Sequence, residues 1–98
     1  MQDQRIGVAG SLESCDVLVM VILSAESRGM TLEIDSPSLA SFGEEMKNTV
    51  MEIMETLGIP HAVIKVQDRG ALDCTLRART EAAAKRALAV PVGEKVSE

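Results

Sequence analysis

The first long apolar run of the chain is Asp16–Ser24, DVLVMVILS, in which aliphatic and β-branched residues follow one another without interruption. A run of this length and composition predicts a well-buried strand. After a turn that ends in Gly29, the segment Met30–Ser36 alternates apolar and polar side chains. This is the period of a strand with one face in water. The short separation predicts that these two strands form a hairpin.

The next segment has the period of a helix. Ser36 is the predicted N-cap, and Pro37 takes the first helical position, where its missing N–H costs nothing. One apolar stripe with spacings of four, four, three and four is expected in the core: Phe42, Met46, Val50, Ile53 and Leu57. Gly58 suits the left-handed turn that ends the helix, and Pro60 prevents its continuation.

The last third begins with the predicted strand His61–Gln67, whose apolar residues alternate. A tight turn follows at Asp68–Gly70, with Gly70 expected at positive φ. Apolar residues also alternate over 71–78, which predicts a further strand, although the same letters fit the start of a helix. Arg79–Leu88 has strong helix propensity and predicts a second helix.

The resulting order, β-β-β-α-β-β-α, predicts an α+β fold. We expect a two-layer sandwich in which two helices cover a mostly antiparallel sheet. The 98 residues are expected to form a single domain, 1–98, with an ordered core over about 6–88. Residues 1–5 and the tail Pro91–Glu98 are predicted to be loose.

Composition narrows the class of partner. A formal charge of −5 and a single aromatic residue, Phe42, argue against nucleic-acid binding, because phosphate contacts need clustered cations and single strands need stacking platforms. An acidic surface suits docking onto basic patches of proteins. No apolar run reaches the ~18–20 residues of a membrane span, and no secretory leader is evident, so a cytoplasmic location is expected. Cys15 and Cys74 are predicted to be reduced thiols packed as small apolar side chains, and with one histidine they give no metal-ligand spacing.

Nothing in the sequence makes a self-sufficient active site. His61, the only histidine, lacks a local partner for general-base chemistry, so a structural role is favoured. Ser11 and Ser14 lack the G-x-S-x-G context of a nucleophile elbow. Three acids fit solvated turn and helix-start positions better than a pair of catalytic carboxylates: Asp68, Asp73 and Glu81. These observations favour a module that binds, or is acted upon, over a catalyst.

Two motifs carry a family resemblance. VAGSLESCDVLV (residues 8–19) and VQDRGALDCTLRARTEAA (residues 66–83) together closely resemble the acyl carrier (gamma) subunit of citrate lyase, over about Ile6 to Leu88. The pairing of the two motifs is more specific than either alone. One departure is Cys15, which stands where the family commonly has glycine after its modified serine; a small side chain fits a loop but narrows its backbone conformations.

The resemblance implies that Ser14 is the attachment site of a prosthetic group. In that family the serine hydroxyl is joined by a phosphodiester to 2'-(5''-phosphoribosyl)-3'-dephospho-CoA, whose terminal thiol bears the acetyl group. The implied partners are the citrate lyase alpha (transferase) and beta (lyase) subunits, which cleave citrate to acetate and oxaloacetate, and the enzymes that attach and acetylate the arm. The chain itself would be non-catalytic. An exposed loop and a flexible tether suit this role.

Other residues near these motifs leave two interpretations open. Glu13 and Asp16 either shape the loop for the modifying enzyme or are ordinary solvated turn acids. Arg77 and Arg79 either contact phosphates of the arm or acids of a partner, or are solvated guanidinium groups at a strand end.

Two rival functions remain at this stage. The carrier subunit of malonate decarboxylase uses a related arm on a serine, and the motifs L-E-S-x-D and A-L-D-C favour the citrate lyase branch over it. The second rival is a small interaction or regulatory domain without a cofactor. A four-helix acyl carrier protein is disfavoured, because its D-S-L motif at a helix start is missing.

Overall fold

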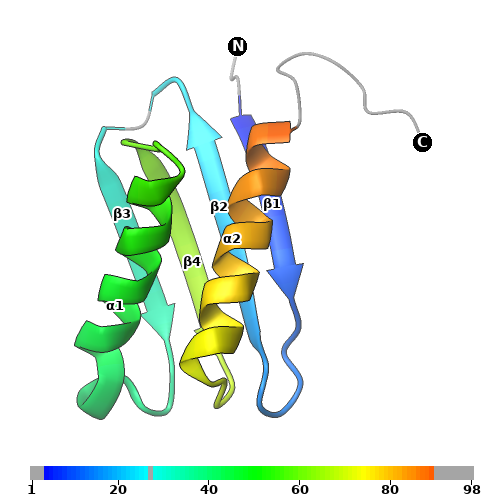
Figure 1. Cartoon of the computed structure of the whole chain (residues 1–98), viewed down its shortest axis with the longest axis vertical. Helices are drawn as coiled ribbons and strands as arrows, with labels where there is room; N and C mark the ends of the chain where they lie inside the picture. Colours follow the sequence, from blue (N-terminus) through cyan, green and yellow to red (C-terminus); the bar gives the residue numbers. More distant parts are fainter. Residues whose placement is uncertain (1–3, 27, 90–98) are drawn as a thin grey trace.

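Two helices pack on the same face of a four-stranded sheet whose strand order is β1-β2-β4-β3 (Figure 1). The computed structural model describes residues 4–26 and 28–89. The elements are β1 (Gln4–Gly10), β2 (Val17–Ser24), β3 (Met30–Asp35), α1 (Leu39–Thr56), β4 (Ala62–Asp68) and α2 (Asp73–Ala89). Two of the three strand pairings are antiparallel. The predicted α+β class, with two helices over a mostly antiparallel sheet, is confirmed.

The central position in the sheet is shared by β2 and β4, the strands with the most continuous apolar sequence. The residues of β2 that face the helices are fully or nearly fully buried: Val17, Val19, Val21 and Leu23. Those of β4 are buried as well: Ala62, Ile64 and Val66, as the alternation predicted. The intervening residues of β2 point to the opposite face and are half-buried.

The predicted hairpin between the second and third strands is wrong. β3 lies at the far edge of the sheet and pairs in parallel with β4, while β2 pairs with β1 and β4. The connection from β3 to β4 runs through α1, and a strand–helix–strand crossover brings its two strands together in parallel. The half-polar alternation of β3 suits an edge, whereas the apolar β4 suits the interior.

The predicted fifth strand over 71–78 is also wrong, because α2 begins at Asp73 and contains most of that segment. The carboxylate of Asp73 lies in the first helical turn, where negative charge is favoured. One turn later, Arg77 Nε donates to Asp73 Oδ2 at 2.9 Å. The buried residues of α2 recur at helical spacing: Leu76, Thr80, Ala83, Ala84 and Ala87. The predicted helix 79–88 is the later part of this element.

The N-cap of the first helix is Ser38, two residues after the predicted cap at Ser36. Ser36 Oγ donates to Asp68 Oδ2 at 2.8 Å and accepts from the Ser38 N–H at 3.0 Å, so Ser36 closes a turn that precedes the helix. The helix starts at Leu39, with Ser38 at the N-cap and without a side-chain cap bond. Ser36 therefore bonds the buried carboxylate of Asp68 and does not cap the helix, although its sequence position favours a cap.

The predicted apolar stripe of α1 is only partly buried. Val50 is fully buried, whereas Met46 is half-buried and Phe42 is 54% exposed. Phe42 lines an open cleft of about 340 Å³ between α1 and the β4–α2 connection, together with Leu72. Phe42 therefore lies at an open surface and not in the core.

The close packing of α2 on β1 depends on a residue without a side chain. A Cβ at Gly7 would lie 2.0 Å from the Ala83 carbonyl oxygen and 2.4 Å from the Ala87 nitrogen. At the same edge, Arg86 Nη1 donates to the carbonyl oxygen of Val8 at 2.6 Å. This arginine occupies an acceptor that an edge strand otherwise offers to another chain.

Several smaller predictions have clear outcomes. Gly58 (φ +72°) and Gly70 (φ +92°) adopt the expected positive φ. β1 begins at Gln4, two residues before the expected start of the ordered core. The tail 91–98 lies outside the described residues, as do residues 1–3. Within 4–26 and 28–89, neither helix combines the length and the apolar character needed to cross a membrane.

Candidate functional site

The loop that joins β1 to β2 carries Ser14 and is fixed to the end of β4. The Cys15 N–H donates to the Arg69 carbonyl at 2.8 Å, and the Arg69 N–H donates to the Asp16 carbonyl at 2.9 Å. These two bonds extend the β2–β4 ladder beyond its last register pair, Val17 with Asp68. The loop is therefore anchored to the sheet by backbone hydrogen bonds close to Ser14.

Residues 13–16 form a tight turn in which the Asp16 N–H donates to the Glu13 carbonyl at 3.1 Å. Cys15 has φ +67°, so the third residue of the turn is in the left-handed region. A positive φ at that position alone is characteristic of a type II turn, which favours glycine there. Cys15 thus stands in a conformation that glycine adopts without strain.

Ser14 is exposed at the tip of this turn. Within the described part of the chain, its hydroxyl has one polar contact, at 3.8 Å from Cys15 Sγ. This contact is weak and solvent-exposed, so it leaves the oxygen accessible to another molecule. An accessible hydroxyl on an anchored loop fits the attachment of a bulky group.

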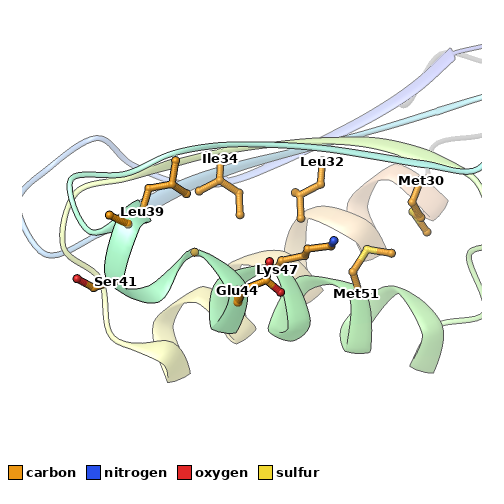
Figure 2. A pocket seen from close by; sticks show the side chains of 10 residues that line it. Met30, Leu32, Ile34, Leu39, Ser41, Glu44, Lys47 and Met51 are labelled. Carbon is orange, nitrogen blue, oxygen red and sulfur yellow. The ribbon is translucent and has the colours of Figure 1, made fainter.

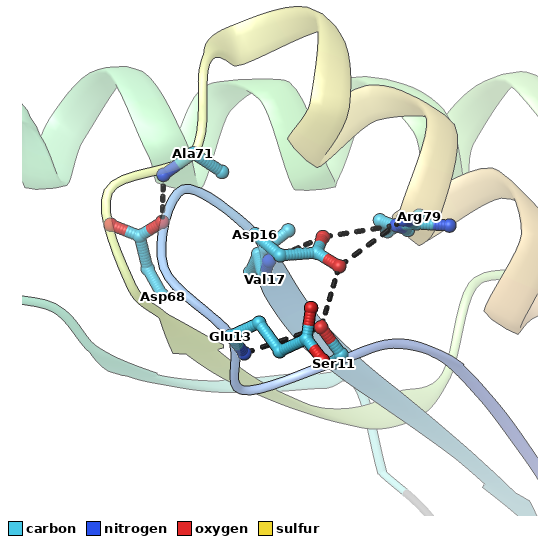
Figure 3. A network of polar contacts seen from close by, with 7 residues as sticks. All are labelled: Ser11, Glu13, Asp16, Val17, Asp68, Ala71 and Arg79. Atoms are coloured by element: carbon cyan, nitrogen blue, oxygen red, sulfur yellow. Dashed lines mark hydrogen bonds and ion pairs between the residues drawn. The ribbon is translucent and has the colours of Figure 1, made fainter.

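The side chain of Asp16 ties the loop together from beneath (Figure 3). Its carboxylate accepts from Ser11 Oγ at 2.7 Å and from the Val17 N–H at 2.7 Å. Arg79 of α2 adds two further bonds at 3.2 Å, from Nε and Nη2 to the two carboxylate oxygens. The Ser11 bond, followed by those from Val17 and Arg79, lowers the pKa of Asp16 below its usual value. Asp16 therefore acts as an anionic brace that joins the loop to α2.

The β4–α2 connection has a similar brace in Asp68, which is only 3% exposed. Its carboxylate accepts from Ser36 Oγ at 2.8 Å and from the Ala71 N–H at 2.9 Å. The prediction of a solvated turn acid is wrong for this residue. Because Arg69 follows Asp68 directly, the brace also fixes the carbonyl that holds Cys15.

Arg77 belongs to a separate cluster that joins the two helices. It bonds Asp73 within α2, and its Nη2 lies 3.1 Å from Glu52 Oε1 of α1. Thr49 Oγ1 donates to Asp73 Oδ1 at 2.6 Å. These contacts, that of Thr49 foremost, lower the pKa of Asp73, and the same carboxylates raise the pKa of Arg77. Arg77 and Arg79 are thus both held in ion pairs within the chain, so neither is a merely solvated guanidinium.

The remaining sequence candidates stand apart from this loop. His61 is exposed, and its Nδ1 accepts the Gly29 N–H at 2.7 Å, a structural role of the kind favoured from the sequence. Cys15 and Cys74 are both free, but both are exposed, so the prediction that they pack as small apolar groups is wrong. Ser11, the other serine of the loop, is engaged by Asp16.

An open groove of about 580 Å³ lies between β3 and α1 (Figure 2). Apolar side chains of β3, such as Leu32 and Ile34, form one wall, and Leu39 and Met51 of α1 form the other. Binding sites for small molecules usually combine apolar walls with a few converging polar groups. Here the charged residues, Glu44 and Lys47, are both solvent-exposed, so we assign no ligand to this groove.

The chemistry of the Ser14 loop is presentation of a hydroxyl and not its activation. Of the two carboxylates that flank Ser14, Asp16 is engaged by Ser11, Val17 and Arg79. Within the described residues, the Ser14 hydroxyl contacts Cys15 Sγ and not the exposed Glu13. Sequence analysis identified Ser14 through a motif, but it did not identify the partner of Asp16, which lies 63 residues away on a helix.

Comparison with known proteins identifies a family model and sequence relatives that cover most of the chain. A family model described as "ACP: Malonate decarboxylase delta subunit (MdcD)" matches residues 4–87. The citrate lyase acyl carrier protein of Haemophilus influenzae (strain PittGG) is 45% identical over 87 residues, covering 89% of this chain and 88% of that protein. The protein of the same name from Streptococcus equi subsp. zooepidemicus (strain H70) is 41% identical over 90 residues, covering 92% and 87%.

Among solved structures, the fold is similar to a chain in the crystal structure of a Pseudomonas malonate decarboxylase hetero-tetramer in complex with malonate. The TM-score is 0.56 at 18% identity, and the alignment covers 89% of this chain and 88% of the other. At this identity the likeness establishes the fold alone.

Proposed function

Because the chain belongs to the family of acyl carrier proteins that contains the citrate lyase carriers and the malonate decarboxylase delta subunit, we propose that it is the acyl carrier subunit of a citrate lyase. In this proposal Ser14 carries the phosphoribosyl-dephospho-CoA arm through a phosphodiester. The partners are the transferase (alpha) and lyase (beta) subunits and the enzymes that attach and acetylate the arm. The complex works in the cytoplasm.

The observation that carries the proposal is the exposed Ser14 hydroxyl on a loop that hydrogen bonds anchor to β4 and α2. Attachment forms a bond from Ser14 Oγ to the phosphorus of an activated arm, while the activating phosphate departs and the hydroxyl proton passes to a base of the modifying enzyme. When bound, the arm supplies a terminal thiol that carries the acyl group as a thioester. The tether keeps that group at high effective concentration near both catalytic subunits.

The rest of the chain keeps the attachment point in place. Asp16 and Arg79 fix the loop to α2, and the Arg69 carbonyl fixes Cys15 to the end of β4. A rigid base restricts motion to the arm itself, so the reach of the thioester is set by the length of the arm. The proposal gives the chain no catalytic role of its own, and it is supported by a Ser14 hydroxyl that bonds neither Glu13 nor Asp16 among the described residues.

The second candidate is a carrier for malonate decarboxylase, which the description of the matching family model favours. The two relatives at 41% and 45% identity are both named citrate lyase acyl carrier proteins, and this favours the first candidate. Reconstitution of citrate cleavage discriminates between the two candidates. The carrier of a citrate lyase, once it bears the arm, supports citrate cleavage when mixed with the alpha and beta subunits, whereas a malonate decarboxylase carrier does not.

Intact-mass spectrometry tests the attachment site. Protein produced alone is expected to have the unmodified mass, and protein produced with the arm-attaching enzymes is expected to gain the mass of one arm. Ser14→Ala is expected to abolish this gain. Ser11→Ala is the matched control, because it removes a hydroxyl from the same loop and leaves Ser14 in place.

The outcomes separate the hypotheses. An arm that still appears on the Ser14→Ala protein would move the attachment site to another residue. A wild-type mass that never changes, with active modifying enzymes verified on a known carrier, would favour an interaction domain without a cofactor.

A further inference from the structure

One face of the sheet carries apolar side chains that no described residue covers. Both helices lie on the opposite face (Figure 1). The register places Ile6, Ile22 and Val63 in one row across β1, β2 and β4, and Val8 beside Met20 in the next. We call this surface the sheet patch: Ile6, Val8, Leu18, Met20, Ile22 and Val63. Ile6 is 46% exposed and Val8 37%, and the other four are half-buried.

This composition is unusual for a face in water. An antiparallel sheet with one solvated face ordinarily shows polar residues on it. The other half of the same face does so, with exposed residues on β3 and β4: Thr31, Glu33, Asp35, Lys65 and Gln67. The unbroken run of β2 is instead typical of a strand covered on both sides. A contiguous apolar patch with a polar border marks a surface that another protein covers.

Area and charge argue against a second copy of the chain as the covering partner. The patch lies on three adjacent strands of seven or eight residues, which span about 10 Å by 24 Å, roughly 240 Å² in projection. A stable interface buries about 800 Å² on each partner. Each copy also carries a net charge of −5, so two copies repel one another. A small patch of this kind suits a short-lived contact with a different protein.

The border of the patch and the charge of the whole chain indicate the charge of that protein. Glu13 is exposed in the loop before β2, and Glu33 and Asp35 are exposed on β3, where Glu33 lies opposite Lys65 and Asp35 is 3.8 Å from Arg69. These acids outnumber the two cations, and the chain as a whole has a net charge of −5. A partner with an apolar centre and a basic rim complements this surface. Leu18 follows Asp16 by two residues, so a protein seated on the patch also adjoins the loop that presents Ser14.

We infer that the sheet patch is the docking surface for a catalytic subunit of the carrier's complex, a protein with an apolar centre and a basic rim. The inference rests on the proposed function, because it is the carrier role that requires repeated, reversible contact with larger subunits. Weak docking through the patch positions the Ser14 loop, and the arm then covers the remaining distance.

The test compares a variant in the patch with a matched variant outside it. Met20→Arg places a charge in the centre of the patch, and Asn48→Arg adds the same charge at an exposed position of α1. Binding of the arm-free chain to purified citrate lyase alpha and beta subunits is measured by calorimetry. We expect Met20→Arg to weaken binding at least tenfold and Asn48→Arg to change it less than twofold. Thermal unfolding verifies both folds, and Val8→Ser replaces Met20→Arg if the latter does not fold.

Two results would overturn the inference. Wild-type affinity in the patch variants would exclude the patch from docking. A wild-type dimer in light scattering that Met20→Arg converts to a monomer would assign the patch to a second copy. The intact mass of the wild-type protein after modification tests the attachment to Ser14 separately. If the arm is on Ser14 but the patch variants bind with unchanged affinity, the docking surface is rejected and the proposed carrier function is kept.

Discussion

At the scale of single residues, Cys15 shows how the loop holds its shape against a local preference. Its φ of +67° is one that side chains with a Cβ rarely adopt, yet its N–H is bonded to Arg69 and the following carbonyl is bonded as well. The left-handed conformation costs roughly 1–2 kcal/mol in a residue other than glycine. The anchoring bonds on both sides offset this strain, so the turn persists with cysteine in a glycine position.

Cys15→Gly is expected to raise the free energy of unfolding by about 1 kcal/mol, the relief of strain less the greater entropy of glycine in the unfolded chain. Cys15→Ala is the control, because it removes the thiol and keeps the strain. Urea denaturation of the three proteins measures the difference. Equal stability of the glycine and alanine variants would show that the loop relieves the strain elsewhere.

The residues of the site differed in how far the sequence could predict them. Ser14 could be identified from a short sequence motif, because the motif and the residue lie within one loop. Arg79 and Asp16 were each singled out, but their pairing was not predicted, because a bond across 63 residues depends on how α2 packs. Asp68 was mistaken for a solvated acid for the same reason: the serine that satisfies it is 32 residues away.

At the scale of elements, the sequence predicted where most segments lie but not how they pair. Strand β3 was recognised by its alternation, yet its partner is fixed by the α1 crossover and not by its nearest neighbour in the chain. Residues 71–78 satisfied two periodicities, and the contacts of Asp73 with Thr49 and Arg77 select the helix. Pairing and element type are thus decided by contacts that a local pattern does not contain.

The packing of α2 on β1 leads to a strong prediction. Gly7→Ala is expected to lower the free energy of unfolding by about 3 kcal/mol, because the new methyl group meets the backbone of α2, which cannot move aside. Gly43→Ala is the matched control in α1, where the nearest atom is the end of the Leu39 side chain at 3.0 Å. This control is expected to gain about 0.5–1 kcal/mol from better helix propensity. Thermal and urea unfolding measure both, and a Gly7→Ala protein of wild-type stability would contradict the close approach.

At the scale of the whole molecule, two carboxylates connect parts of the chain that are distant in sequence. Asp16 joins the Ser14 loop to α2, and Asp73 joins α2 to α1. The pKa of each is lowered in the folded state by its hydrogen bonds. Both ties are strongest when these groups are charged.

The stability of the protein is therefore expected to fall in acid. A carboxylate with a lowered folded pKa contributes its stabilisation above its unfolded pKa, about 3.9, and loses it as the pH falls through the lower folded value. Urea unfolding between pH 7 and pH 2.5 measures this loss. The double variant Asp16→Asn, Asp73→Asn is expected to show a flatter decline, whereas Glu44→Gln, at an exposed position of α1, is expected to follow the wild type. Identical slopes for the double variant and the wild type would contradict this assignment.

The strand order β1-β2-β4-β3 also limits when the sheet can form during synthesis of the chain. A ribosome delivers β2 early, but its second neighbour, β4, is the last strand to emerge and begins only at residue 62. Until then one edge of the apolar strand β2 is unpaired, and β3 has no strand with which to pair. The nascent chain must consequently remain open through most of translation, and the sheet can close only after β4 has been synthesised and has left the ribosome.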